Sequence, residues 1–204
     1  MEKPLLSLND IELAQIKNIA EANEVAIYTA YNHRFEPNIS TLRQALSEGI
    51  LGKIYYARLF YGNGTSMDIK NSPWKDQGNG VLYDLGSHLV DTARFLFQDL
   101  PGDFKLFSGN RFETNSFDHV LLGCGTSPFI ELEATYLSWR KAFSIDVYGE
   151  YGSAHVEGLC KWGPSTYTLR SRIFPSGIPT EDTRVISQPD PTWHLEYEQY
   201  IDLC

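Results

Sequence analysis

An aspartate and a histidine four positions apart, Asp84 and His88, are the side chains of this sequence best suited to acid–base chemistry. On a helix this spacing places both groups on one face. A carboxylate beside an imidazole raises the basicity of the ring and fixes its orientation, as a general base for a hydroxyl proton requires. Two other interpretations of the residues stay open, namely a solvated or capping pair and a metal site completed by Asp91. Because further ligands do not cluster nearby, we predict no metal.

Three more side chains could contact a ligand. Arg34 follows a run of aromatic residues and suits either an anion or sugar contact or a surface position. Trp74, in a glycine-rich stretch, could stack on a sugar ring or anchor its loop. Lys3, read alone, is a surface lysine. We interpret the other histidines as structural, and these are His33, His119, His155 and His194.

Helices and strands must hold these residues in place. Asn9 and Glu12 match a capping box at the start of a helix. Apolar residues at helical spacing predict four helices, which cover residues 10–23, about 37–49, 80–97 and 193 onward. β-branched and aromatic runs predict strands at 24–31 and 53–61, with a long loop over 62–80. After residue 101 the pattern becomes six consecutive strands, at 104–112, 117–124, 129–137, 142–149, 154–160 and 165–174, followed by an irregular proline-rich connection over 175–191. This order predicts an α+β fold, a predominantly antiparallel open sheet with helices packed on one face.

Composition excludes several classes of protein. The chain has 204 residues and a formal net charge of −9, which argues against binding to a nucleic acid backbone. No apolar run is long enough to span a membrane, and no signal-peptide pattern is present. The three cysteines form neither a disulfide framework nor a zinc pattern. We therefore expect a cytoplasmic protein with reduced thiols.

Four short motifs occur in a fixed order, and together they resemble one family. They are Glu2-Lys3-Pro4 and residues 31–35, 49–54 and 80–91. This set resembles the glucose–fructose oxidoreductase / inositol dehydrogenase (Gfo/Idh/MocA) family, whose catalytic half has a dihydrodipicolinate-reductase-like fold. The resemblance covers nearly the whole chain.

The resemblance implies a catalytic set of Lys3, Asp84 and His88. His88 would take a proton from a sugar hydroxyl, Asp84 would orient His88, and Lys3 would place positive charge where alkoxide character develops. It also implies NAD or NADP as cofactor and a sugar, cyclitol or sugar nucleotide as substrate. On this basis we assign Lys3 and Asn32 to the cofactor side.

The substrate side would consist of Arg34, Trp74 and Asp91. Subunits would associate as a homo-oligomer through the open face of the sheet.

The sequence departs from the family in one large feature, because no Gly-x-Gly-x-x-Gly lies between a strand and a helix. We expect residues 1–31 to be a remnant of a nucleotide-binding domain and its crossover segment. Residues 32–204 would then be the substrate and oligomerisation domain, shortened at its last helix. Such a chain would bind no cofactor by itself and would be inactive in isolation. The alternative is a non-enzymatic, degenerate module used for sugar binding or subunit association.

Overall fold

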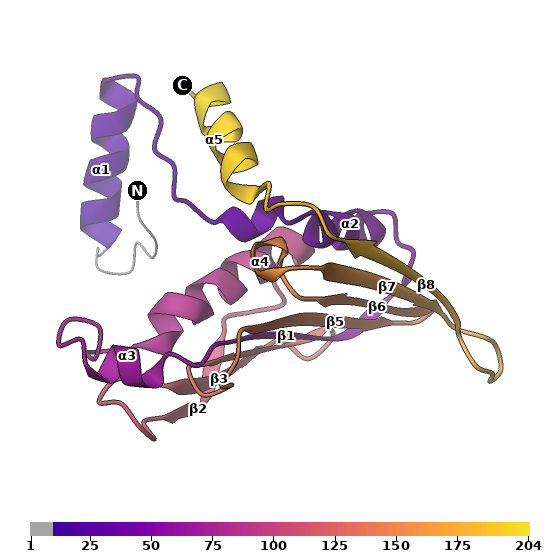
Figure 1. The fold of residues 1–204 in the computed structure, drawn as a ribbon. Coiled ribbons are helices and arrows are strands. Elements are labelled where there is room, and N and C mark those ends of the chain that lie inside the picture. Colours follow the sequence, from indigo (N-terminus) through magenta and orange to yellow (C-terminus); the bar gives the residue numbers. More distant parts are fainter. Residues whose placement is uncertain (1–9) are drawn as a thin grey trace.

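A single eight-stranded sheet dominates the computed structural model, which describes residues 10–204. The strands lie in the order β2-β3-β4-β1-β5-β6-β7-β8 (Figure 1). Neighbouring strands run antiparallel except β1 and β4, which pair in parallel. The strands are β1 Ile54–Gly62, β2 Lys105–Asn110, β3 His119–Cys124, β4 Phe129–Thr135, β5 Ala142–Gly149, β6 Gly152–Glu157, β7 Ser165–Ser171 and β8 Thr180–Ile186.

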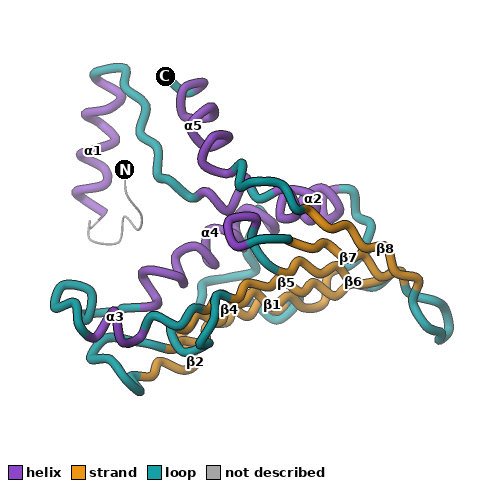
Figure 2. The backbone as a smooth tube through the Cα atoms, viewed as in Figure 1, coloured by secondary structure: helices purple, strands orange, loops and turns teal. Residues whose placement is uncertain are grey.

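Helices lie on one side of this sheet (Figures 1 and 2). In chain order they are α1 Asp10–Ala22, α2 Pro37–Ser47, α3 Ser66–Lys70, α4 Ser87–Phe97 and α5 Thr192–Asp202. Those that pack on the face of the sheet are α2 and α4. Two short 3-10 turns, Asn32–Phe35 and Cys160–Trp162, connect these elements, and a π-helical turn, Leu82–Gly86, leads into α4. In residues 10–204, no helix is both long and apolar enough to cross a membrane.

The core lies between the sheet and the helices α2 and α4. Side chains alternate between the two faces of a strand, and on β1 this rule buries Ala57, Leu59 and Tyr61 while Arg58 points to the other face. On α4, Leu89 and Ala93 are fully buried against the same layer. The α+β class with a mostly antiparallel open sheet is thereby confirmed.

Three local predictions were wrong. Residues 24–31 form no strand, because none of the described strands lies beside this segment to complete its backbone hydrogen bonds. The connection over 175–191 contains β8, whose polar residues pair with β7 along the sheet edge. The loop over 62–80 contains the short helix α3.

Helices α1 and α5 extend beyond the edge of the sheet layer (Figure 1). On α5, Thr192 and Glu196 are buried, whereas Trp193 and Tyr197 are exposed. The buried side of α5 packs on the segment that follows α1, since the Tyr28 hydroxyl donates to Glu196 at 3.3 Å. This contact fixes the crossing segment against the C-terminal part of the fold.

We predict that Gly80 is essential to the turn before α4. Its φ is +45°, and a Cβ there would come within 2.3 Å of the Phe117 carbonyl oxygen, which accepts the Val81 N–H at 2.8 Å. Gly80→Ala should therefore lower the free energy of unfolding by about 3 kcal/mol in urea titrations. Gly78→Ala is the matched control, because Gly78 has a φ of +61° with open space around it. It should cost about 1 kcal/mol, and equal losses at both positions would contradict the close approach.

Candidate active site

The helix that carries Asp84 and His88 begins irregularly. Residues 82–86 form a π-helical turn, and regular α-helix starts at Ser87, whose hydroxyl donates to the Asp84 carbonyl oxygen at 3.0 Å. The wider turn changes the angular offset between the two side chains from that of an ideal α-helix. The sequence pattern gave one continuous helix over 80–97, so this irregularity was not predicted. Turns of this kind are frequent at functional sites.

Tyr61, at the end of β1, contacts one of the two predicted catalytic side chains. Its ring packs against His88 with centroids 6.1 Å apart. Burial, and secondarily the charge of Asp84, raise the pKa of the Tyr61 phenol. The same two causes raise the pKa of Tyr136, whose hydroxyl donates to Asp84 Oδ2 at 3.3 Å. Both phenols therefore remain neutral at physiological pH and can serve as hydrogen-bond donors near Asp84.

His88 lies within a group of rings and is only 8% exposed. His33 stacks on it with centroids 4.4 Å apart and planes 25° from parallel, and Tyr31 approaches it edge-on at 5.7 Å. Sequence reasoning treated His33 as structural, yet the structure places it in direct contact with the candidate base. The only sequence signal for this contact was its place next to Asn32 in a motif of the family.

A short turn brings a lysine to the same cluster. Lys161 lies 5.7 Å from the Tyr61 ring centroid and 5.2 Å from that of Trp162, and its Nζ is 3.4 Å from the Tyr61 hydroxyl. The buried carboxylate of Glu36 holds this turn, because both of its oxygens accept the Cys160 N–H at 3.2 Å. Burial and the adjacent Glu36 raise the pKa of the Cys160 thiol to about 12, so this thiol stays protonated.

Two of the predicted substrate contacts bind each other. Arg34 Nε donates to Asp91 Oδ2 at 2.8 Å, and its Nη2 pairs with the second oxygen of the same carboxylate. This bidentate pair raises the pKa of Arg34. It joins the turn that contains His33 to α4, and so it holds the two histidines in register. A cavity of about 420 Å³ lies beside it, lined by Asp91, Ser87 and Tyr31 among others.

The remaining predicted site residues lie in different surroundings. The buried Asn32 amide donates to Thr192 Oγ1 at 3.0 Å and thereby attaches α5 to the turn. Trp74 is 75% exposed, and the Lys75 ammonium lies 5.0 Å from its ring centroid. Lys3 lies outside the described residues. The structure thus places Tyr136 against Asp84 and Tyr61 against His88, pairs Arg34 with Asp91, and leaves Trp74 on an exposed loop.

The described residues can be compared with what a metal ion and a dinucleotide each require of a binding site. Among residues 10–204, no group of three His, Cys, Asp or Glu side chains could hold a metal ion. A dinucleotide phosphate site needs a strand, a glycine-rich turn and a helix in succession. Within the same residues, the glycine-rich turn before α4 follows the loop that contains α3 rather than a strand. These residues therefore do not fit the pyrophosphate of NAD or NADP.

The family is decided by a match to a family model. Residues 39–155, more than half of the chain, match the model of the GFO/IDH/MocA C-terminal domain. The chain belongs to this family. The matched range includes α2 from its third residue, β1, the whole turn with Asp84 and His88, and the strands up to His155. The resemblance stated from the four motifs is confirmed.

Characterised relatives of this GFO/IDH/MocA chain are dehydrogenases. A levoglucosan dehydrogenase of Pseudarthrobacter phenanthrenivorans is 33% identical over 47% of this chain and 25% of its own length. An NADP(+)-dependent scyllo-inositol 2-dehydrogenase of Bacillus subtilis is 30% identical over 48% of this chain and 27% of its own length. The matched segments thus span little more than a quarter of these relatives.

Solved structures share the fold. An oxidoreductase from Desulfitobacterium hafniense aligns over 99% of this chain and 61% of its own, with a TM-score of 0.83 and 17% identity. An inositol dehydrogenase homologue from Azotobacter vinelandii, solved with NADH and myo-inositol, aligns over 91% of this chain and 48% of its own, with a TM-score of 0.70 and 17% identity. At these identities the alignments establish the fold alone.

We predict a pH signature for the buried Glu36. Burial raises the pKa of its carboxyl above the ordinary value of 4.5. Between the ordinary pKa and the higher pKa of the folded chain, the Glu36 carboxyl is ionised in the unfolded chain and protonated in the folded chain. The free energy of unfolding of the wild type therefore falls as the pH rises through this range. Glu36→Gln keeps an acceptor for the Cys160 N–H but cannot ionise. Its free energy of unfolding, relative to wild type, should rise as the pH is raised from below 4.5 toward neutrality.

Chemical denaturation at a series of pH values measures this difference. Glu48→Gln, at the exposed end of α2, controls for the loss of one negative charge. A difference between Glu36→Gln and wild type that does not change with pH would contradict the prediction.

Proposed function

We propose that this chain is the substrate-binding and catalytic part of an NAD(P)-dependent oxidoreductase that acts on a sugar, a cyclitol or a sugar nucleotide. One observation carries the proposal. In a member of the GFO/IDH/MocA family, two buried tyrosines meet the predicted catalytic pair on the helix-covered side of the sheet: Tyr136 binds Asp84 and Tyr61 packs against His88. Named relatives that act on levoglucosan and scyllo-inositol support the substrate class.

In this proposal the chain supplies the proton-handling side of the reaction. His88 accepts the proton of a substrate hydroxyl, because its ring is held between other rings and can turn little. Asp84 orders the hydrogen bonds around that hydroxyl together with the neutral phenols of Tyr61 and Tyr136. Lys3 would stabilise the developing negative charge. Arg34, Trp74 and Asp91 would contribute substrate contacts around this centre, and Asn32 would position the adjoining turn.

The cofactor is treated separately, since residues 10–204 do not fit its pyrophosphate. We propose that a nucleotide-binding unit outside these residues holds NAD or NADP against the His88 side of the fold. The described residues alone then bind the substrate without oxidising it.

Substrate binding and turnover should separate in the purified chain. We expect ligand-observed NMR to detect myo-inositol or levoglucosan on the wild type, and absorbance to show no reduction of added NAD or NADP. His88→Gln and Asp84→Asn should each weaken binding about tenfold, because the first removes the neutral ring nitrogen that accepts from the substrate hydroxyl and the second removes a charged acceptor. His194→Gln, on the exposed side of α5, is the matched control.

Circular dichroism would verify that both site variants fold. Binding that is unchanged in both folded variants, or absent from the wild type, would contradict the proposed site. Reduction of NAD or NADP by the chain alone would contradict the assignment of the cofactor to another unit.

We also propose that the open face of the sheet binds a second copy of this chain. Four aromatic rings cross this face in a row, with successive centroids 5.8 to 6.3 Å apart, and they belong to Phe107, Phe129, Tyr56 and Tyr148. Gly123 on β3 makes room for the row, since a Cβ there would come within 2.4 Å of the Phe107 ring. Because the ring faces cover each other, their apolar edges are available to a partner.

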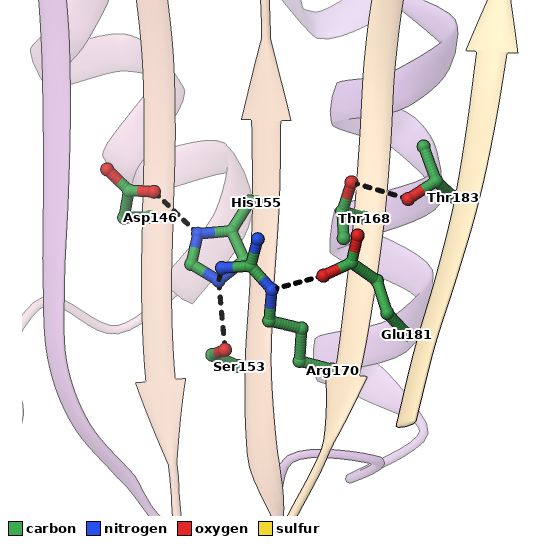
Figure 3. A network of polar contacts seen from close by, with 7 residues as sticks. All are labelled: Asp146, Ser153, His155, Thr168, Arg170, Glu181 and Thr183. Carbon is green, nitrogen blue, oxygen red and sulfur yellow. Dashed lines mark hydrogen bonds and ion pairs between the residues drawn. The ribbon is translucent and has the colours of Figure 1, made fainter. Parts of the chain in front are cut away.

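Polar side chains beside this row already satisfy one another (Figure 3). His155 Nδ1 lies 2.6 Å from Asp146 Oδ1, and its Nε2 lies 3.2 Å from Arg170 Nη1. Arginine can only donate, so this geometry describes a neutral imidazole whose Nδ1–H donates to Asp146. Arg170 also binds Glu181 on β8 at 2.7 Å. The face therefore offers apolar edges framed by paired charges, which suits a self-complementary contact with limited desolvation cost.

A single charge should weaken this association. Tyr148→Glu would place a carboxylate among the stacked rings, and we expect sedimentation velocity to show dimer dissociation at about tenfold higher protein concentration. Tyr197→Glu, an equally drastic change on α5 away from this face, should leave association unchanged. A wild-type chain that sediments only as a monomer would contradict the proposal.

A further inference from the structure

Three arginines gather around one cavity of this acidic chain. The cavity measures about 420 Å³ and is separate from the one beside Asp91. It is lined by Arg34 from the 3-10 turn, Arg43 from α2 and Arg94 from α4. The other described lining residues are rings and amides, namely Phe35, Phe95, Gln98 and Gln199. None of these seven side chains carries a negative charge, although the chain has a net charge of −9.

Two of the three guanidinium groups are held in place by neighbouring side chains. Arg34 gives Asp91 two of its five N–H donors and keeps the others. Arg43 lies over the Phe95 ring, with its Cζ 4.2 Å from the ring centroid. Such contacts reduce the entropy that an arginine loses when it binds a ligand. Arg94 is exposed at the last turn of α4 and completes the set.

We propose that this cavity is a binding site for a phosphate group on a small molecule. A guanidinium fork matches two phosphate oxygens at once, and several forks together can compensate the charge of a phosphate dianion. The Gln98 and Gln199 amides supply neutral donors beside them. Without an anion, three like charges around one cavity repel each other, and the only carboxylate that compensates them in the described contacts is Asp91.

The position of Arg94 connects this cavity to the candidate catalytic cluster, which consists of Asp84, His88 and the rings around them. Arg94 lines both cavities, and the second cavity is also lined by Tyr31, whose ring contacts His88. Arg94 lies six positions after His88 on the same helix, which corresponds to about 9 Å along a helix axis. A phosphorylated ligand could thus reach from the three arginines toward His88. This connection depends on the proposed function, whereas phosphate binding itself does not.

Calorimetric titration of the full chain tests the site with three probes, which are inorganic pyrophosphate, glucose 6-phosphate and unphosphorylated glucose. We expect the two phosphorylated probes to bind through this cavity and glucose not to bind there. Arg43→Gln and Arg94→Gln should each lower the affinity for the phosphorylated probes at least about tenfold. Added salt should weaken binding in the wild type more than in the variants.

Arg111→Gln is the matched control, because Arg111 makes a similar contact, 4.0 Å from the Phe117 ring centroid, at another place in the fold. Stronger binding of glucose 6-phosphate than of pyrophosphate would assign the site to a sugar monophosphate, and the reverse order would assign it to the diphosphate of a sugar nucleotide. Absence of binding by both phosphorylated probes, or affinities unchanged in both arginine variants, would overturn the proposal. Because the titration requires no turnover, its failure would leave the assignment of His88 and Asp84 standing.

Discussion

The contact between the end of β1 and the helix α4 is the constraint on which the site depends. β1 lies at the centre of the sheet, and its helix-facing side chains Ala57 and Leu59 are fully buried. Strand periodicity then places Tyr61 on the same face, two residues after Leu59. The ring reaches the cluster because α4 packs on this part of the sheet through Leu89. Removing that packing would separate the histidines from the strand that positions them.

Because helices cover only one face of the sheet, the other face is open, and this explains most of the residue types found on it. A sheet with one bare face normally carries polar residues there, and the charged pairs of Arg58 with Glu131 and Glu133 follow this rule. The stacked row from Phe107 to Tyr148 departs from it. Apolar rings exposed in a row on a sheet favour a covered state, and this is the reason for the proposal that a second copy covers the face.

Much of this architecture could be predicted from residue patterns, and the exceptions have physical causes. The six strands after residue 101 were visible because alternation and turn residues are local signals. β8 was missed because an edge strand with polar residues lacks that alternation. Residues 24–31 have strand-forming composition, but a strand needs a partner, and no local pattern shows whether one exists.

The site was predictable only in part, for a similar reason. The spacing of Asp84 and His88 pointed to acid–base chemistry, and their roles remain predictions. The neighbours that define their environment, Tyr61, His33 and Tyr136, come from segments far apart in the chain. The spacing of these three residues in the sequence does not predict that they surround Asp84 and His88, since only tertiary packing brings them there.

The Arg34–Asp91 pair shows how one interaction can serve both the catalytic cluster and the arginine-lined cavity. A bidentate pair with one buried partner costs desolvation free energy, so such a pair is weak evidence for a purely stabilising role. Here it fixes the turn with His33 against α4 and, at the same time, orients one of the three guanidinium groups at the cavity. A hydrophobic pair could supply the first contact but not the second. The presence of charge at this junction is therefore better explained by ligand recognition than by stability.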